Sequence, residues 1–364
     1  MDKTNIRYKK VAVKIGSNVL TRPDGTLDIT RMSALVDQIS VLHKLGVQLV
    51  LISSGAVASG RSVMGISKKM DIVEQRQLFS TVGQAKLINH YWELFREHGI
   101  VVGQVLTTKT NFEGRSQYLN QRNCIRIMLE NKVIPIVNEN DAVSVSELMF
   151  TDNDELSGLI ASMLGMEALI ILSNIDGIYN GSPSNPESAV IRKIRKGEDI
   201  SDFIQTSKST LGRGGMQTKT SIARKIADEG IEVIIANGKR ENILIDLLDK
   251  QKDTVCTIFE ASATDVSSVK KWIAHSDGFA KGEIHINENA EKALSGPKAT
   301  SLLPVGVTQI TGTFEKDDIV KIVGSNGKII GVGKVQYNNE KARQLIGKKN
   351  QKPLIHYDYL YIED

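Results

Sequence analysis

Cysteine and histidine are scarce in this chain of 364 residues. Its two cysteines, Cys124 and Cys256, are far apart and show no CxxC spacing, which excludes a zinc site built from thiolates and favours a reducing compartment. The six histidines form neither a metal-binding spacing nor a triad-like cluster. We therefore expect a chemistry that needs no catalytic histidine, and we assign no metal ligand among the side chains.

Long hydrophobic runs are also missing. The first ten residues, MDKTNIRYKK, are charged, and the apolar run that follows is only VAV before Lys14. Because no segment suits a secretory signal or a membrane span, we expect a soluble protein of the cytoplasm. The formal net charge of +4 is small for this length and argues neither for nor against a nucleic-acid partner.

The length predicts two domains. In residues 1–262, short β-branched runs alternate with helical periodicity, which is typical of an α/β domain with a mostly parallel sheet. An amphipathic helix is expected from Ile29 to Leu45, with Gly46 as its stop. The predicted strands are Lys10–Ser17, Val47–Ser53, Ile100–Leu106, Lys132–Asn138, Ala168–Ser173 and Ile231–Asn237.

The pattern changes after residue 262. Residues 263–277 are predicted to form a linker, and short alternating runs then follow, separated by Gly, Asn and Asp. These runs are GEIHIN, VGVTQITGTF, DIVKIVG and KIIGVGKVQY, and Asn326-Gly327 carries a hairpin signal. Short helices are expected at Ala290–Leu294 and Asn339–Ile346. Residues 278–364 therefore predict a small β-barrel-like second domain.

The ends of the first two strands carry polar features. Ligands collect at the carboxyl ends of parallel strands, so these ends are the place to look for a site. Lys14 lies inside the first strand, and a buried lysine needs an anionic partner because burying a bare ammonium group is costly. The second strand runs into Ser53, Ser54 and Gly55, small residues that leave backbone N–H groups available to an anion.

A glycine-rich segment, LGRGGMQTK, precedes another predicted helix. Lys219 falls within the first turn of that helix, where a cation opposes the helix dipole. The position suits a lysine that joins the helix N-terminus in holding a phosphate. The spacing does not match the P-loop pattern, so a phosphate site here belongs to another fold.

The fourth feature is an acidic stretch, NENDAVSVSELMFTDNDELSG, which follows a strand. Its residues Asp141, Asn153 and Asp154 are suited to binding an amino group, to binding Mg²⁺ with its waters, or to aligning the two lysines. A carboxylate between Lys14 and Lys219 would restrain both side chains. A plain polar loop is the alternative for each acid taken singly, but TDNDE as a unit is predicted to cap a helix at the same strand ends.

These features together indicate phosphoryl transfer from a nucleotide. That chemistry depends on positioning and on neutralising charge more than on covalent participation. No general base is needed if the acceptor is a carboxylate, because a carboxylate with a pKa of about 4 is already ionised at neutral pH.

Five motifs, in this order, resemble those of the glutamate 5-kinases in the amino acid kinase superfamily: VAVKIGSNVLT, ISSGAVASGR, VIPIVNENDAV, TDNDELSG and GRGGMQTK. The segment SLLPVGVTQITGTFEKDDIVKI resembles a PUA domain. The resemblance covers nearly the whole chain and implies a three-layer αβα sandwich with a C-terminal PUA domain. It also implies ATP-dependent phosphorylation of the side-chain carboxylate of L-glutamate, the first step of proline biosynthesis, with Mg²⁺ as companion ion.

The resemblance also implies roles for particular residues. Lys14, Lys219 and Asp154 match the catalytic positions, with Asp154 organising the two lysines. Ser54, Asp141 and Asn153 match the glutamate-binding positions, and Asp141 would pair with the substrate α-ammonium group. The ATP-binding positions match Lys14, Ser173, Asn174, Arg213, Gly214, Gly215, Met216, Gln217, Thr218 and Lys219.

Two positions depart from the family pattern. Family members often carry Asp where Asn174 stands and Thr where Arg213 stands. Neither change removes an implied catalytic group, but both bear on nucleotide affinity, since the guanidinium group would either add a phosphate contact or crowd the loop.

The resemblance further implies a homo-oligomer, dimer or tetramer, feedback inhibition by proline and handover of product to glutamate-5-semialdehyde dehydrogenase. Another kinase of the superfamily, acting on N-acetylglutamate, aspartate or carbamate, is disfavoured by the motif pair NENDAV and TDND. An RNA-binding protein acting through the PUA domain is the alternative from another class. Residues 278–364 hold 12 Lys or Arg against 10 Asp or Glu, a net charge of +2, which is weak for gripping phosphates.

Overall fold

The computed structural model describes residues 2–64, 71–113, 115–144, 150, 152–183, 185–200, 203, 215–263, 273, 280–296 and 300–362. The chain divides into two compact units, Met1–Asp265 and Val266–Asp364. The predicted linker, residues 263–277, lies almost wholly outside the described residues, so its boundaries stay a prediction. Within the described part of the chain, no helix is both long and apolar enough to cross a membrane.

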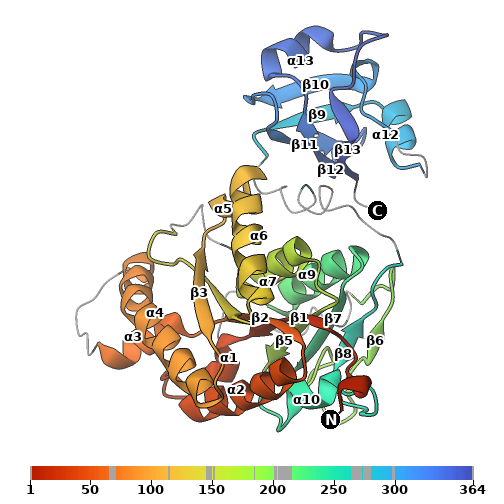
Figure 1. Ribbon diagram of the computed structural model, residues 1–364. Helices are drawn as coiled ribbons and strands as arrows, with labels where there is room; N and C mark the ends of the chain where they lie inside the picture. Colours follow the sequence, from red (N-terminus) through yellow and green to blue (C-terminus); the bar gives the residue numbers. More distant parts are fainter. Residues whose placement is uncertain are drawn as a thin grey trace. The chain divides into compact units, whose positions relative to one another are not determined.

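The first unit is built on an eight-stranded sheet with the order β3-β4-β2-β1-β5-β7-β8-β6 (Figure 1). Its neighbouring strands run parallel except for the antiparallel pair β7 and β8. The strands are β1 (Lys10–Ile15), β2 (Gln48–Ser53), β3 (Val102–Thr107), β4 (Ile134–Glu139), β5 (Ala168–Ser173), β6 (Lys193–Ile194), β7 (Glu232–Asn237) and β8 (Thr257–Phe259).

Helices cover both faces of this sheet. Figure 1 shows α6, α7 and α9 on one face and α2 and α10 on the other, which confirms the predicted three-layer α/β sandwich. The described helices of this unit are η1 (Lys3–Asn5), α1 (Ser17–Leu20), α2 (Ile29–Lys44), α3 (Ala56–Val63), α4 (Ile72–Glu97), α5 (Thr110–Glu113), α6 (Arg115–Glu130), α7 (Asn153–Leu164), α9 (Met216–Asp228) and α10 (Ile243–Leu248).

The six strands predicted for this unit are confirmed to within two residues at each end. Five of them are almost wholly buried and apolar on both faces, while β3, at the edge of the sheet, is half-buried. The predicted helix at Ile29 is α2, and Gly46 follows it with φ +94, a conformation that favours glycine. β6 and β8 were not predicted. They hold only two and three residues, too few to show a periodic pattern.

Helices α3 and α4 approach each other closely through two glycines. A Cβ on Gly83 of α4 would lie 1.8 Å from the carbonyl oxygen of Ala56, and one on Gly60 of α3 would lie 1.8 Å from that of Phe79. Both contacts are with backbone, which cannot move aside as a side chain can. The pair of glycines therefore fixes the position of α4 relative to the end of β2, where α3 begins.

The second unit is a five-stranded sheet with the order β10-β9-β11-β12-β13 (Figure 1). β9 and β11 run parallel and the other neighbouring pairs antiparallel. Its described elements are β9 (Gly282–Ile286), α12 (Glu288–Leu294), η3 (Pro304–Gly306), β10 (Val307–Gly312), β11 (Ile319–Val323), β12 (Ile329–Val335), α13 (Asn339–Leu345) and β13 (Ile355–Ile362).

Most of this second sheet was predicted. Four alternating runs form β9 to β12, the two short helices form α12 and α13, and Asn326-Gly327 turns the chain between β11 and β12 with Gly327 at φ +80. β13 was missed, although its sequence IHYDYLYI is rich in the aromatic residues that favour strands. It pairs with β12 and contributes Leu360 to the apolar core of this unit.

The close contact of α3 and α4 gives a first prediction. Gly83→Ala should lower the free energy of unfolding by about 1–3 kcal/mol, because the added methyl group forces the two helices apart. Thermal unfolding followed by circular dichroism measures this. Thr81→Ala, an exposed change on the same helix, is the control. A Gly83→Ala protein as stable as the control would contradict the packing described here.

Candidate active site

Polar and charged side chains gather where β1, β2, β4 and β5 end. The N-termini of α7 and α9 lie at the same edge of the sheet, since their first turns bring residues to the ends of these strands. Most of these groups are buried: Lys14, Ser54, Asn138, Asp141 and Asp154 each expose less than a tenth of their surface. Such burial of polar groups is costly unless each finds a partner.

Asp154 joins the two lysines that the sequence singled out. Its Oδ1 lies 2.5 Å from Nζ of Lys14, and its Oδ2 lies 2.8 Å from Nζ of Lys219. The Asp154 side chain is completely buried, while those of Lys14 and Lys219 are 6% and 15% exposed. Three segments far apart in the sequence, β1, α7 and α9, are thus held together at one carboxylate.

Two lysines face the carboxylate of Asp154. Burial by itself would raise the pKa of Asp154, but the charges of Lys14 and Lys219 outweigh it and lower the pKa to about 2. Asp154 is therefore ionised at neutral pH, and these three side chains carry a net charge of +1. Asp152, which also interacts with both lysines and has a pKa of about 6, offsets that charge when it is ionised. The two amino groups, held at fixed positions, are nevertheless suited to binding an anion such as a phosphate.

The first turn of α7 explains how Asp154 is placed. Asp152 is the N-cap, and its Oδ1 accepts hydrogen bonds from the backbone N–H groups of Asp154 and Glu155 at 2.8 and 3.1 Å. Burial and the nearby charge of Asp154 raise the pKa of Asp152 to about 6. The prediction that TDNDE caps a helix is confirmed for Asp152 to Glu155.

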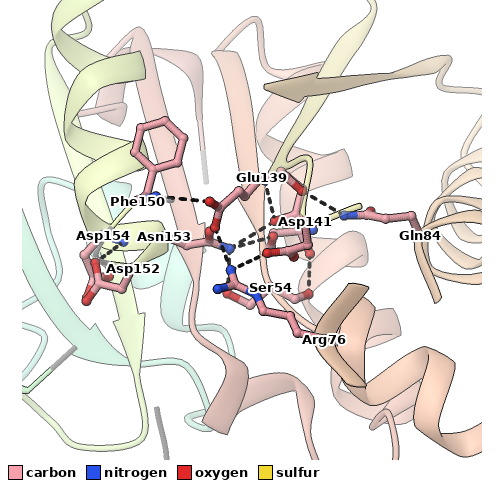
Figure 2. Close-up of polar contacts among 11 residues, drawn as sticks. Ser54, Arg76, Gln84, Glu139, Asp141, Phe150, Asp152, Asn153 and Asp154 are labelled. Atoms are coloured by element: carbon pink, nitrogen blue, oxygen red, sulfur yellow. Dashed lines mark hydrogen bonds and ion pairs between the residues drawn. The ribbon is translucent and has the colours of Figure 1, made fainter. Parts of the chain in front are cut away.

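A second polar group surrounds Asn153. Its Nδ2 donates to the hydroxyl of Ser54 at 3.1 Å, to the side-chain oxygen of Asn138 at 3.1 Å and to the carbonyl of Ser53 at 3.2 Å. Asn153 thereby joins the end of β2 to the end of β4. Ser54 and Asn153 are thus in direct contact, and the third predicted substrate-binding residue, Asp141, follows Asn138 by three positions (Figure 2).

Asp141 belongs to a carboxylate pair with Glu139. Arg76, from α4, donates from Nη2 to Oε2 of Glu139 at 2.7 Å and also forms an ion pair with Oδ1 of Asp141 (Figure 2). Burial, followed by the charge of Asp141, raises the pKa of Glu139 to about 7, although Arg76 opposes the shift. Burial also raises the pKa of Asp141, again against Arg76.

Helix α4 fixes the segment that carries this pair. Gln84 donates to the backbone carbonyl of Glu139 at 3.2 Å, and Gln77 donates to that of Ala142 at 3.3 Å. On the other side, the backbone N–H of Phe150 donates to Oε1 of Glu139 at 3.0 Å. The acidic stretch is therefore a structured wall of the site at Glu139 to Asp141, while residues 145–149 lie outside the described part.

The predicted nucleotide-binding residues fall at a neighbouring place on the same edge. Ser173 ends β5 and donates to the exposed Asn174 at 3.4 Å. Gly215 is the N-cap of α9, followed by Met216, Gln217, Thr218 and Lys219 in its first turn. Arg213 and Gly214 lie outside the described residues.

Three site residues were not predicted from the sequence. Asn138 and Glu139 stand in the motif VIPIVNENDAV, three and two positions before Asp141. Because they are polar residues at the end of a predicted strand, the sequence could have indicated both. Arg76 offered none, because it lies in a long helix 65 positions before Asp141 and reaches the site only through the packing of α4.

The raised pKa of Glu139 gives a prediction for stability. A carboxyl group whose pKa is raised from 4.5 to about 7 on folding favours the folded state below pH 4.5, and this contribution is lost as the pH rises through 7. Glu139→Gln removes the ionisation. The melting temperature of the variant minus that of the unchanged protein should therefore be larger at pH 8 than at pH 5.

Glu130→Gln, an exposed change on α6, is the matched control and should show no such trend. If the difference for Glu139→Gln stayed constant from pH 5 to pH 8, Glu139 would ionise as readily in the folded chain as in the unfolded one.

Comparison with known proteins places these features in a family. The model of the amino acid kinase family matches residues 9–237, and that of the PUA domain matches residues 282–357. A glutamate 5-kinase of Bacteroides thetaiotaomicron is 70% identical over 98% of this chain and 99% of its own length. A glutamate 5-kinase of Chlorobaculum tepidum is 47% identical over 98% of each chain.

A solved structure supports the fold. Carbamate kinase from Giardia lamblia, bound to AMP-PNP, superposes with a TM-score of 0.51 over 70% of this chain and 99% of its own, at 15% identity. An identity this low shows a shared fold alone. The sequence relatives carry the finer assignment: this chain belongs to the glutamate 5-kinases, within the amino acid kinase family, and ends in a PUA domain.

Proposed function

We propose that this chain transfers the γ-phosphoryl group of ATP to the side-chain carboxylate of L-glutamate, giving L-glutamyl 5-phosphate and ADP, the first step of proline biosynthesis. One observation carries the mechanism. A pair of lysines joined by a carboxylate, Lys14-Asp154-Lys219, lies at the same sheet edge as a polar group containing an acid suited to an amino group, Asp141. The two clusters match the two ends of an amino acid with a side-chain carboxylate.

The reaction needs positioning rather than a base. An oxygen of the substrate side-chain carboxylate attacks the γ-phosphorus, the bond from that phosphorus to the β-phosphate oxygen breaks, and ADP leaves. The attacking group is ionised at neutral pH, because its pKa is about 4, so no proton has to be removed. The remaining barrier comes from bringing anions together and from the charge that develops on the transferring group.

Lys14 and Lys219 supply the compensating charge. Both amino groups would contact the transferring phosphoryl group and stabilise its developing charge. Asp154 would contact neither substrate, and its function is to hold both lysines at fixed positions, 2.5 and 2.8 Å from its oxygens. Pre-positioned charges are worth more than mobile ones, since no reorganisation is needed during the reaction.

The other polar group would bind glutamate. Asp141 would pair with the α-ammonium group, while Ser54 and Asn153 would bind the rest of the polar substrate. The hydrogen bond between Ser54 and Asn153 supports this role, because it fixes both side chains before the substrate arrives. Proline, whose secondary ammonium group has the same charge, would compete here as a feedback inhibitor.

ATP would bind between the carboxyl end of β5 and the N-terminus of α9. Ser173 and Asn174 would line one side, and residues 213–219 the other. Within that segment the start of α9 supports phosphate binding, since Gly215 is its N-cap and Lys219 lies in its first turn.

Mg²⁺ would accompany the nucleotide. Among the described residues, no group of three or more His, Cys, Asp or Glu side chains could hold a metal ion. Both oxygens of Asp154 face lysines, so the donor set suits an ion held mainly by phosphate oxygens and water. When bound, Mg²⁺ supplies charge neutralisation at the phosphates.

We extend the proposal to assembly and location. Exposed apolar side chains on α4 and α6, among them Trp92 and Ile127, support a homo-oligomer formed through the kinase unit. The lability of an acyl phosphate favours handover to a glutamate-5-semialdehyde dehydrogenase. Two free cysteines, Cys124 and Cys256, and the use of ATP support a cytoplasmic location.

The test measures ADP release with L-glutamate, Mg²⁺, ATP and hydroxylamine, which traps an acyl phosphate as its hydroxamate. We expect hydroxamate with L-glutamate and none with N-acetylglutamate, with aspartate or without acceptor. Lys219→Ala should lower kcat about 10²–10³-fold, the usual cost of one charge-stabilising group. Lys225→Ala, on the same helix outside the site, is the control.

Hydroxamate formed from a different acceptor would support phosphorylation of a carboxylate but would contradict glutamate as the substrate. Hydroxamate formed at the original rate by Lys219→Ala would overturn the role of that lysine. No turnover with any acceptor would overturn the proposal as a whole.

A further inference from the structure

Arg76 reaches the proposed amino-acid site from a remote helix. It lies one turn into α4, whose start is fixed by a capping box between Asp71 and Glu74. Its side chain is 18% exposed and lies between Glu139 and Asp141 (Figure 2). It is too well buried to be a surface charge, and the proposed reaction gives it no role so far.

Arg76 contacts both acids through one nitrogen. Its Nη2 donates a hydrogen bond to Oε2 of Glu139 at 2.7 Å and forms an ion pair with Oδ1 of Asp141. Burial raises the pKa of Asp141, and the charge and hydrogen bond of Arg76 oppose that shift. Arg76 therefore balances the charge of Asp141. A carboxylate accepts several hydrogen bonds, so Asp141 can still accept one from an ammonium group.

Without Arg76, the carboxylates of Glu139 and Asp141 would lie close together with no cation between them. The side chains of Glu139 and Asp141 are 2% and 9% exposed, and two buried like charges side by side disfavour ionisation of both. Of the described charged groups, Arg76 is the cation paired with either acid. Loss of its charge would leave one or both acids protonated, and a neutral Asp141 cannot pair with an ammonium group.

We propose that Arg76 is a positioning residue that keeps Asp141 ionised and in place for the α-ammonium group of the substrate, and so determines the affinity for an amino acid. This inference rests on the proposed function, in which Asp141 binds that group. Glu139 anchors Arg76 by their hydrogen bond. The incoming ammonium group then donates a further hydrogen bond to Asp141.

The experiment compares Arg76→Gln, Arg76→Lys and the control Arg96→Gln, an exposed change on the same helix. Steady-state assays give kcat and the KM values for L-glutamate and ATP. Arg76→Gln should raise the KM for L-glutamate about 10–100-fold, the scale of a lost charge-assisted interaction, with kcat and the KM for ATP within about threefold. Arg76→Lys, which keeps the charge, should recover most of that loss, and Arg96→Gln should change nothing.

A substrate analogue separates charge from packing. Glutarate has both carboxylates of glutamate and no ammonium group, and its inhibition constant against glutamate should be nearly unchanged in Arg76→Gln. Equal loss of affinity for glutamate and glutarate would overturn the proposal, as would an unchanged KM for glutamate. A joint fall of kcat, ATP affinity and melting temperature would instead assign Arg76 a purely structural role and also overturn it.

The failure of the proposed function would look different. In that case the unchanged protein itself would form no hydroxamate from glutamate, whatever residue stands at position 76.

Discussion

The site depends on one buried carboxylate between two lysines. Asp154 contacts Lys14 from β1 and Lys219 from α9, and it stands in the first turn of α7. Removing one partner from such a buried group leaves uncompensated charges, so the three residues act as a unit. In the proposed reaction the two lysine charges are useful rather than costly, since both would face the anionic phosphoryl group that is transferred. The lysines are thereby held in position before the substrates bind, which is the main contribution a protein makes to phosphoryl transfer.

A second cluster at the same edge of the sheet is built around acidic side chains rather than lysines. There Glu139 and Asp141 share Arg76, and Asn153 connects the ends of β2 and β4. In the proposed function, the acidic group would bind the ammonium group of the substrate and the two lysines would lie toward its side-chain carboxylate. The glycine contact between α3 and α4 belongs to the same arrangement, because α4 carries Arg76 and Gln84 into the site. Packing far from the chemistry thus controls the geometry of the acids.

Much of this was readable in the sequence, for physical reasons. Central strands such as β1 and β5 are apolar on both faces, and Lys14 was conspicuous because a charge in such a strand needs a partner. The partner could be predicted because Asp154 belongs to a helix cap at a strand end. Arg76 could not be predicted, since its contact with Asp141 depends on how α4 packs. The strands β6 and β8 were missed because their pairing, rather than their own pattern, makes them strands.

The central claim is that Asp154 acts through the lysines, and a double-mutant cycle tests it most directly. The kcat of Asp154→Asn, Lys219→Ala and the double variant would be compared under saturating glutamate, ATP and Mg²⁺. Since the two side chains are in direct contact, the account predicts strong coupling, with the double variant at least about tenfold more active than the product of the single losses implies. Losses that simply multiply would show that Asp154 and Lys219 contribute independently, and would contradict the account.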